Sequence, residues 1–259
     1  MSASVNIGLA LLLTTGAGIS TGVGSAIAYF IKNPKMTYLA FSLGFSAGVM
    51  IYISFVELMP QATIVVGEVR SATAFFLGIV LIGLIDIMIP ETQNPDHFKH
   101  PLAITESQPD DYLMRTGYLT ALAIGMHNLP EGLATFGATL TNANLGVITA
   151  VAIAVHNIPE GISVSVPIFF ATGNKNKAFF YSFCSGLTEP LGALIGYSIL
   201  RPFLSATVLA SLLSFIAGIM VYISLDQLLP AAQRYGCGHV TIIGVVLGMF
   251  VMALSLLIL

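Results

Sequence analysis

Charged residues are scarce in this chain of 259 residues, where they make up only 8% of the sequence. Soluble domains carry about 25% charged residues, so an ordinary soluble domain is excluded. Hydrophobic residues account for 56% of the chain. This composition indicates a protein that crosses a membrane several times.

Cysteine and tryptophan are also rare. The two cysteines, Cys184 and Cys237, are too few for a disulfide framework or a cysteine-based zinc module. Tryptophan, which commonly anchors helices at the membrane surface, is absent. We therefore expect tyrosines such as Tyr29, Tyr38 and Tyr118 to provide that anchoring.

Long apolar runs fill most of the chain. A spanning helix needs roughly 20 mainly apolar residues, and eight such runs remain between polar, proline or charged clusters. We expect an all-α polytopic membrane protein in which residues 1–259 form a single transmembrane domain. The predicted spans are about 5–30, 37–60, 72–90, 117–140, 145–171, 177–200, 203–230 and 240–259. The longest connector is a polar loop at residues 91–116.

The basic residues predict the orientation. Seven of the nine lie in the first, third, fifth and seventh connectors: Lys32, Lys35, Lys99, Arg115, Lys175, Lys177 and Arg234. Only Arg70 and Arg201 lie on the opposite side. Because basic residues accumulate in cytoplasmic loops, we expect the 91–116 loop to be cytoplasmic and both termini to face outward.

An internal repeat links two of the spans. Residues 47–60 match residues 217–230 at an offset of 170, in the second and seventh spans, which cross in opposite directions. Inverted repeats are typical of secondary transporters, so we expect a 3+2+3 arrangement with spans four and five in the middle. Three G-x-x-x-G pairs predict close helix packing. They are Gly44/Gly48, Gly192/Gly196 and Gly244/Gly248.

Spans four and five carry one motif twice, HNLPEG at 127–132 and HNIPEG at 156–161. Each copy places a His and a Glu four residues apart, on one face of a helix. Imidazole and carboxylate are ligands for borderline divalent metals such as Zn²⁺. A charged side chain at the bilayer centre costs about 2.5–3.5 kcal/mol, which a cation between the two helices would offset.

The predicted metal ligands therefore come from both motif copies. The four first ligands are His127, Glu131, His156 and Glu160. The carbonyl oxygens of Asn128 and Asn157 extend the site to a second metal, with the two glutamates bridging. The alternative is that these polar groups only hydrogen-bond across helices, which the duplication of the whole hexapeptide argues against.

Each motif also contains a proline, Pro130 or Pro159, which has no N–H to donate. We expect a break in each helix there, with freed carbonyls beside a cation path.

Acidic and histidine residues outside the motifs give weaker signals. Glu189, in span six, is predicted to reach the central site. Glu57 is either a ligand at the outer end of span two or a hydrated helix end. His97 and His100 either take up exiting metal or simply belong to the polar loop.

The paired hexapeptides, the eight spans and the loop with histidines resemble the ZIP family of divalent-metal transporters, closest to its bacterial ZupT-like branch. The resemblance covers essentially the whole chain. It implies a binuclear site with the ligands named above, and it matches Glu189 to the family's acidic position on span six. It implies uptake of Zn²⁺, and in this branch often of Fe²⁺, Mn²⁺, Co²⁺ and Cd²⁺, into the cytoplasm across a bacterial plasma (inner) membrane.

The expected partners are thus divalent metal ions and the lipid bilayer, with no nucleic acid. The family also implies frequent dimers, so a homodimer stands beside a monomer. We expect no enzyme activity and no resident cofactor, because the metal is cargo. The alternative is an intramembrane metalloenzyme with a di-metal His/Glu site, although the H-x-x-x-E spacing differs from the E-x-x-H of di-iron helices.

Overall fold

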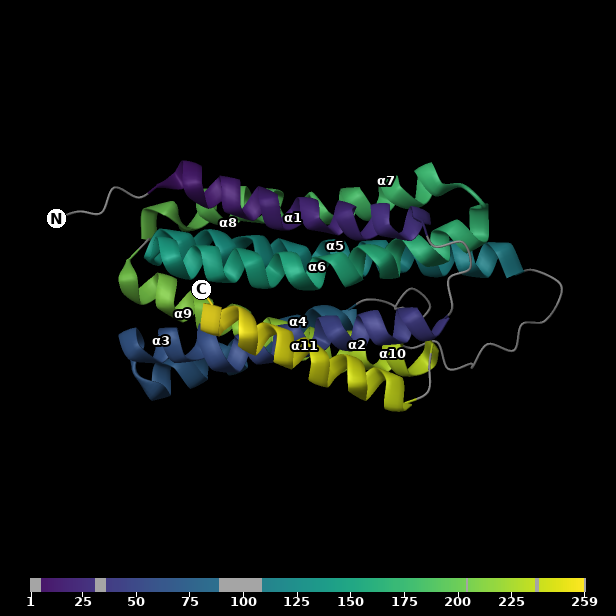
Figure 1. Ribbon diagram of the computed structural model, residues 1–259. Helices are drawn as coiled ribbons and strands as arrows, with labels where there is room; N and C mark the ends of the chain where they lie inside the picture. Colours follow the sequence, from purple (N-terminus) through teal and green to yellow (C-terminus); the bar gives the residue numbers. More distant parts are fainter. Residues whose placement is uncertain (1–5, 31–35, 89–108, 204, 236–237, 259) are drawn as a thin grey trace.

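The computed structural model describes residues 6–30, 36–88, 109–203, 205–235 and 238–258 (Figure 1). All regular structure within these ranges is helical, and no strand occurs there. The predicted all-α, multi-pass membrane architecture is confirmed.

The helices are continuous over most of the described residues. In chain order they are α1 (Ile7–Phe30), α2 (Met36–Ile53), η1 (Ser54–Leu58), α3 (Met59–Val66), α4 (Glu68–Met88), α5 (Pro109–Thr141), α6 (Ala143–Thr172), α7 (Lys175–Gly186), α8 (Thr188–Leu200), η3 (Arg201–Phe203), α9 (Ala206–Ile223), η4 (Ser224–Leu228), α10 (Leu229–Tyr235) and α11 (Gly238–Ile258).

Six segments of the described chain are long and apolar enough to cross a membrane. They are Ile7–Ile27, Thr37–Val66, Glu68–Ile87, Ala143–Val166, Ala206–Gln233 and Gly238–Ile258. The other two predicted spans coincide with α5, which carries a polar motif, and with α7–α8, which is interrupted. The number of eight spans stays a prediction.

Local sequence signals set several helix ends. The Asn142 side chain accepts hydrogen bonds from the first N–H groups of α6, and Gly173, with φ +61°, ends that helix. Proline suits the first helical position because its missing N–H has no partner there, and α5 begins at Pro109. The first turns of α5 therefore fall within the predicted loop 91–116, whose residues up to 108 lie outside the described part.

Two π-helical turns sit at equivalent places in the internal repeat. The Met59 N–H bonds to the Ser54 carbonyl, five residues back, and the Leu229 N–H bonds to the Ser224 carbonyl. A proline follows each turn, Pro60 or its counterpart, and its ring excludes the usual contact with the carbonyl four residues earlier. The wider π turn accommodates that constraint.

The long helices form two groups, seen one above the other in Figure 1. In one, α1 packs on α6, and α8 packs on α5. In the other, α2 packs on α11, and α9 packs on α4. The groups meet where α2 contacts α6 and where α9 contacts α5, so the paired helices α5 and α6 lie at the centre.

Glycines allow the closest helix contacts, and their positions follow the repeat. A Cβ on Gly48 would overlap the Val245 carbonyl oxygen of α11, and one on Gly218 would overlap the Phe75 carbonyl oxygen of α4. The two contacts are related by the same offset of 170 residues. The close packing predicted for the G-x-x-x-G pairs is thereby confirmed at the α2–α11 interface.

We expect Gly48→Ala to destabilise the protein, because the added methyl group must push α11 away. The cost should be about 1–3 kcal/mol, seen as a melting temperature several degrees lower in detergent. Gly16→Ala is the matched control, because Gly16 lies on exposed α1 surface with no atom within 4 Å of an added Cβ. An equal effect of the two substitutions would contradict this packing.

Candidate metal centre

The centre lies between two adjacent helices, α5 and α6. α5 contributes Asn128 and Glu131, and α6 contributes His156, Asn157 and Glu160. All five side chains are at most 1% exposed. A buried group of this polarity needs partners for its acceptors, because an unpaired polar atom in an apolar interior is costly.

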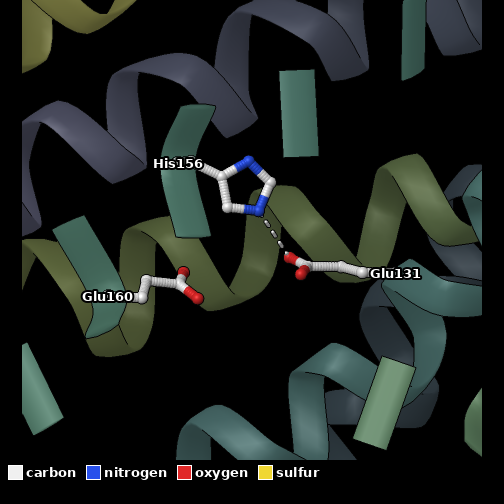
Figure 2. Close-up of side chains that lie close together, drawn as sticks. All are labelled: Glu131, His156 and Glu160. Atoms are coloured by element: carbon white, nitrogen blue, oxygen red, sulfur yellow. Dashed lines mark hydrogen bonds and ion pairs between the residues drawn. The ribbon is translucent and has the colours of Figure 1, made fainter. Parts of the chain in front are cut away.

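Three of these side chains converge on one point (Figure 2). Ligand atoms of Glu131, His156 and Glu160 all lie within 4.8 Å of one another. His156 Nε2 lies 3.2 Å from Glu131 Oε1. One imidazole and two carboxyl groups form a donor set suited to Zn²⁺ and other first-row divalent ions.

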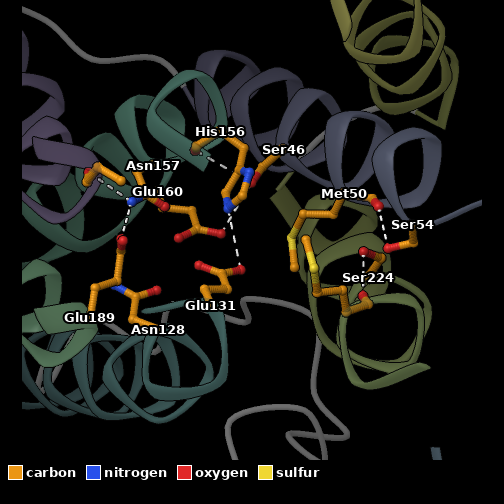
Figure 3. A network of polar contacts seen from close by, with 12 residues as sticks. Ser46, Met50, Ser54, Asn128, Glu131, His156, Asn157, Glu160, Glu189 and Ser224 are labelled. Atoms are coloured by element: carbon orange, nitrogen blue, oxygen red, sulfur yellow. Dashed lines mark hydrogen bonds and ion pairs between the residues drawn. The ribbon is translucent and has the colours of Figure 1, made fainter. Parts of the chain in front are cut away.

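The helix α2 also contacts this group. Ser46 Oγ donates a hydrogen bond to Glu160 Oε1 at 3.1 Å and lies 3.5 Å from the His156 carbonyl oxygen. Figure 3 shows Ser46, Glu160, His156 and Glu131 as neighbours in one polar network.

A second part of the network reaches α8 (Figure 3). Asn157 Nδ2 donates to Glu189 Oε1 and, at 3.0 Å, to the Ala17 carbonyl of α1. Glu189 is fully buried in the first turn of α8, where the helix dipole favours an acidic group. α8 starts there because the chain breaks at Leu187, before Pro190.

Each motif asparagine donates through its amide nitrogen to a neighbouring helix. Asn128 Nδ2 donates to the Ser185 carbonyl at 3.0 Å, which mirrors the Asn157–Ala17 contact. The Oδ1 atoms of both asparagines are buried and accept no hydrogen bond from the described residues. The same holds for Glu131 Oε2 and Glu189 Oε2. Buried acceptors that lack donors fit a bound cation.

The last residue of each motif is a glycine that lets the motif helix pack closely on its neighbour. A Cβ on Gly132 would overlap the Glu189 carbonyl oxygen, and a Cβ on Gly161 would overlap the Thr21 carbonyl oxygen. The glycines thus let α5 approach α8, and α6 approach α1, in symmetric fashion. Thr21 of α1 occupies the position equivalent to that of Glu189 of α8. The acidic group is therefore present only on the α8 side of the centre.

The motif prolines do not break their helices. α5 continues through Pro130 and α6 continues through Pro159, so the expectation of breaks there is wrong. Close packing on neighbouring helices holds both segments helical despite the missing N–H groups. The break that shapes the site is the one at Leu187, between α7 and α8.

The structure brings six of the seven predicted site residues together: Asn128, Glu131, His156, Asn157, Glu160 and Glu189. The His127 side chain lies outside the described part, as do His97 and His100. Glu57 lies on η1, where Gln61 Nε2 is 3.4 Å from its Oε1.

Sequence reasoning missed Ser46 and Thr21. Each is a single small polar residue with no motif around it. Comparison along the repeat offset would have marked Ser46, because its counterpart is the apolar Ile216.

Comparisons with known proteins identify the family of this chain. The family model described as "ZIP Zinc transporter" matches residues 88–256. A protein named Zinc transporter ZupT from Streptococcus mutans is 52% identical over 256 residues, which cover 96% of each chain. Proteins of the same name are 54% identical in Chlorobium phaeovibrioides, covering 96% of this chain and 97% of the relative, and 50% identical in Clostridium perfringens, covering 97% and 96%. This chain therefore belongs to the ZIP zinc transporter family.

Proposed function

We propose that this protein carries Zn²⁺ across a membrane into the cytoplasm, through the site between α5 and α6. The observation that carries the proposal is the buried Glu131–His156–Glu160 group, held by two adjacent helices at the centre of a multi-pass membrane protein. Its relatives in three bacteria are named zinc transporters, which supports the same cargo here.

The site suits a substrate that must bind and leave. His156 and Glu131 contact each other directly, so an arriving ion replaces that contact, and the contact re-forms when the ion departs. Metal release therefore leaves no bare carboxyl group at Glu131. This exchange lowers the net gain from binding and favours turnover over permanent retention.

We extend the cargo to Fe²⁺, Mn²⁺, Co²⁺ and Cd²⁺, because imidazole and carboxyl ligands do not strongly prefer one divalent ion. We also propose a second metal, held by Asn128, Asn157 and Glu189 and bridged by Glu131 and Glu160. The unbonded buried oxygens of the two asparagines support this second position.

We place the protein in the plasma membrane of a bacterium, with both termini outside. The distribution of Lys and Arg supports this orientation, and the bacterial sources of the relatives support the membrane. A homodimer is part of the proposal on the family resemblance alone. Membership of a transporter family disfavours the alternative of an intramembrane metalloenzyme.

Substitution of the central ligands should abolish flux. In proteoliposomes, His156→Ala and Glu160→Gln should each lower the kcat/KM for Zn²⁺ uptake more than about tenfold, because the first removes a metal ligand and the second replaces a charged ligand with a neutral, weaker one. His127→Ala should do the same if its imidazole completes the set. His239→Ala is the control, because His239 is exposed at the start of α11.

Normal flux in the His156 and Glu160 variants would move the cargo path away from this centre. Tight metal binding without flux in the unmodified protein would instead favour the metalloenzyme.

Glu189→Gln should reduce the zinc content of the purified protein from about two ions to about one per chain. The amide oxygen still accepts from Asn157, so the hydrogen bond is retained while the charge is lost. Elemental analysis after dialysis measures the content. Glu68→Gln, in the first turn of α4, is the matched control. One zinc ion per unmodified chain would refute the second metal.

A further inference from the structure

The packing of α1 on α6 repeats the packing of α8 on α5. A Cβ on Gly24 of α1 would overlap the carbonyl oxygen of the third residue of the α6 motif, and a Cβ on Gly192 of α8 would overlap that of the α5 motif. Thr21 lies three residues before Gly24, and Glu189 lies three residues before Gly192. The Cα–Cβ bonds of Thr21 and Glu189 therefore leave equivalent backbones in equivalent directions.

The Thr21 hydroxyl is buried and has no hydrogen-bond partner among the described residues. A helical threonine commonly donates to the carbonyl four residues earlier, as Thr14 does at 2.8 Å. For Thr21 that carbonyl belongs to Ala17, which already accepts from Asn157 Nδ2 at 3.0 Å and from Ser20 Oγ at 2.6 Å. The motif asparagine thus occupies the usual acceptor of Thr21, and the hydroxyl is left for a ligand.

This hydroxyl lies near the other motif asparagine. A Cβ on Gly186, at the end of α7, would lie 2.9 Å from Thr21 Oγ1. The preceding residue is Ser185, whose carbonyl accepts from Asn128 Nδ2 at 3.0 Å. Thr21 and Asn128 therefore lie beside the same two-residue segment. Asn128 Oδ1 is also buried without a partner in the described part of the chain.

The centre is thus charged on the α8 side and neutral on the α1 side. Glu189 accepts from Asn157 through Oε1, and its Oε2 has no described partner. Thr21 offers a single neutral oxygen in the equivalent direction. The affinity of a cation site with oxygen ligands rises with the number of charged ligands. A membrane protein that passes ions must bind them firmly enough to capture them and weakly enough to release them.

We infer that Thr21 is an affinity-determining residue of the metal centre, whose hydroxyl gives the cargo a neutral oxygen donor on the α1 side. A carboxyl group at this position would join those of Glu131, Glu160 and Glu189 and would hold the ion too tightly for rapid release. This inference rests on the proposed function, in which the centre carries the transported metal.

The main test is Thr21→Asp, because aspartate has nearly the shape of threonine and adds a carboxyl group. In detergent, the dissociation constant for Zn²⁺ should fall about tenfold, measured by competition with a zinc-binding dye. In proteoliposomes, the kcat for Zn²⁺ uptake should fall as well, because release becomes slower. Tighter binding combined with slower turnover distinguishes this role from a structural defect, which weakens binding and turnover together.

Two matched controls isolate the charge and its position. Thr21→Asn has the shape of Thr21→Asp without the charge and should not tighten zinc binding. Thr14→Asp places a carboxyl group at another fully buried position of α1, roughly two turns away, and should not tighten it either. Unchanged or weaker zinc binding in Thr21→Asp would overturn the inference, and so would equal tightening in either control.

Thr21→Val and Thr21→Ser test the hydroxyl without adding a charge, so they remain informative if Thr21→Asp does not fold. Valine keeps the shape of threonine and lacks the hydroxyl, whereas serine keeps the hydroxyl. The zinc dissociation constant should rise about threefold or more in Thr21→Val and stay near its original value in Thr21→Ser. Equal dissociation constants in these two variants would refute the donor role.

The Glu160→Gln variant separates this inference from the proposed function. If Glu160→Gln keeps full zinc flux, the centre itself is misplaced and the proposed function fails. If Glu160→Gln loses flux while the Thr21 variants bind zinc as the unmodified protein does, only the role of Thr21 is refuted.

Discussion

The placement of acidic side chains inside a membrane is the constraint on which this structure depends. Glu131, Glu160 and Glu189 are at most 1% exposed, and the sequence has no Lys or Arg between Arg115 and Lys175, the stretch that holds both motifs. The two motif segments themselves therefore bring no Lys or Arg to these carboxyl groups. In the proposed function a divalent ion supplies positive charge here, and imidazole and hydroxyl contacts hold the carboxyl groups when the ion is absent. Under that proposal, binding of the cargo and compensation of the buried charge are the same event.

The two motif helices are held by nearly symmetric contacts, and the polar residues that reach the centre from other helices are not symmetric. Asn128 and Asn157 bond to equivalent carbonyls on α7 and α1, and Gly132 and Gly161 allow equivalent close approaches. These paired contacts orient both motif helices with little freedom. The charged and polar residues that reach the centre have no equivalent on the opposite side. Thr21 occupies the position equivalent to Glu189, and Ile216 occupies the position equivalent to Ser46. One framework therefore offers two different environments to a metal.

The duplicated hexapeptides, the repeat and the apolar runs were enough to predict the helical membrane architecture and the residues that meet at its centre. They were informative because each is a pattern of several residues with a physical period. The contribution of Ser46 was missed, because a lone serine in an apolar helix carries no periodic signal and only its contrast with Ile216 along the repeat marks the position. The prolines misled, because tertiary packing keeps α5 and α6 helical through Pro130 and Pro159. The helix is interrupted instead at Leu187, before Pro190, and nothing in the sequence distinguished this proline from Pro130 and Pro159.

The π turns have a consequence for the partners of the two long helices they interrupt. Each turn contains one more residue than an α turn, which rotates everything beyond it by roughly 100°. Beyond η1, α3 packs on α9. Beyond η4, α10 packs on α2. The long helix α2–η1–α3 therefore ends against α9, and the long helix α9–η4–α10 ends against α2. Because each helix is held at its end by the other, a tilt of one would displace the end of the other, and the two helices would tilt together.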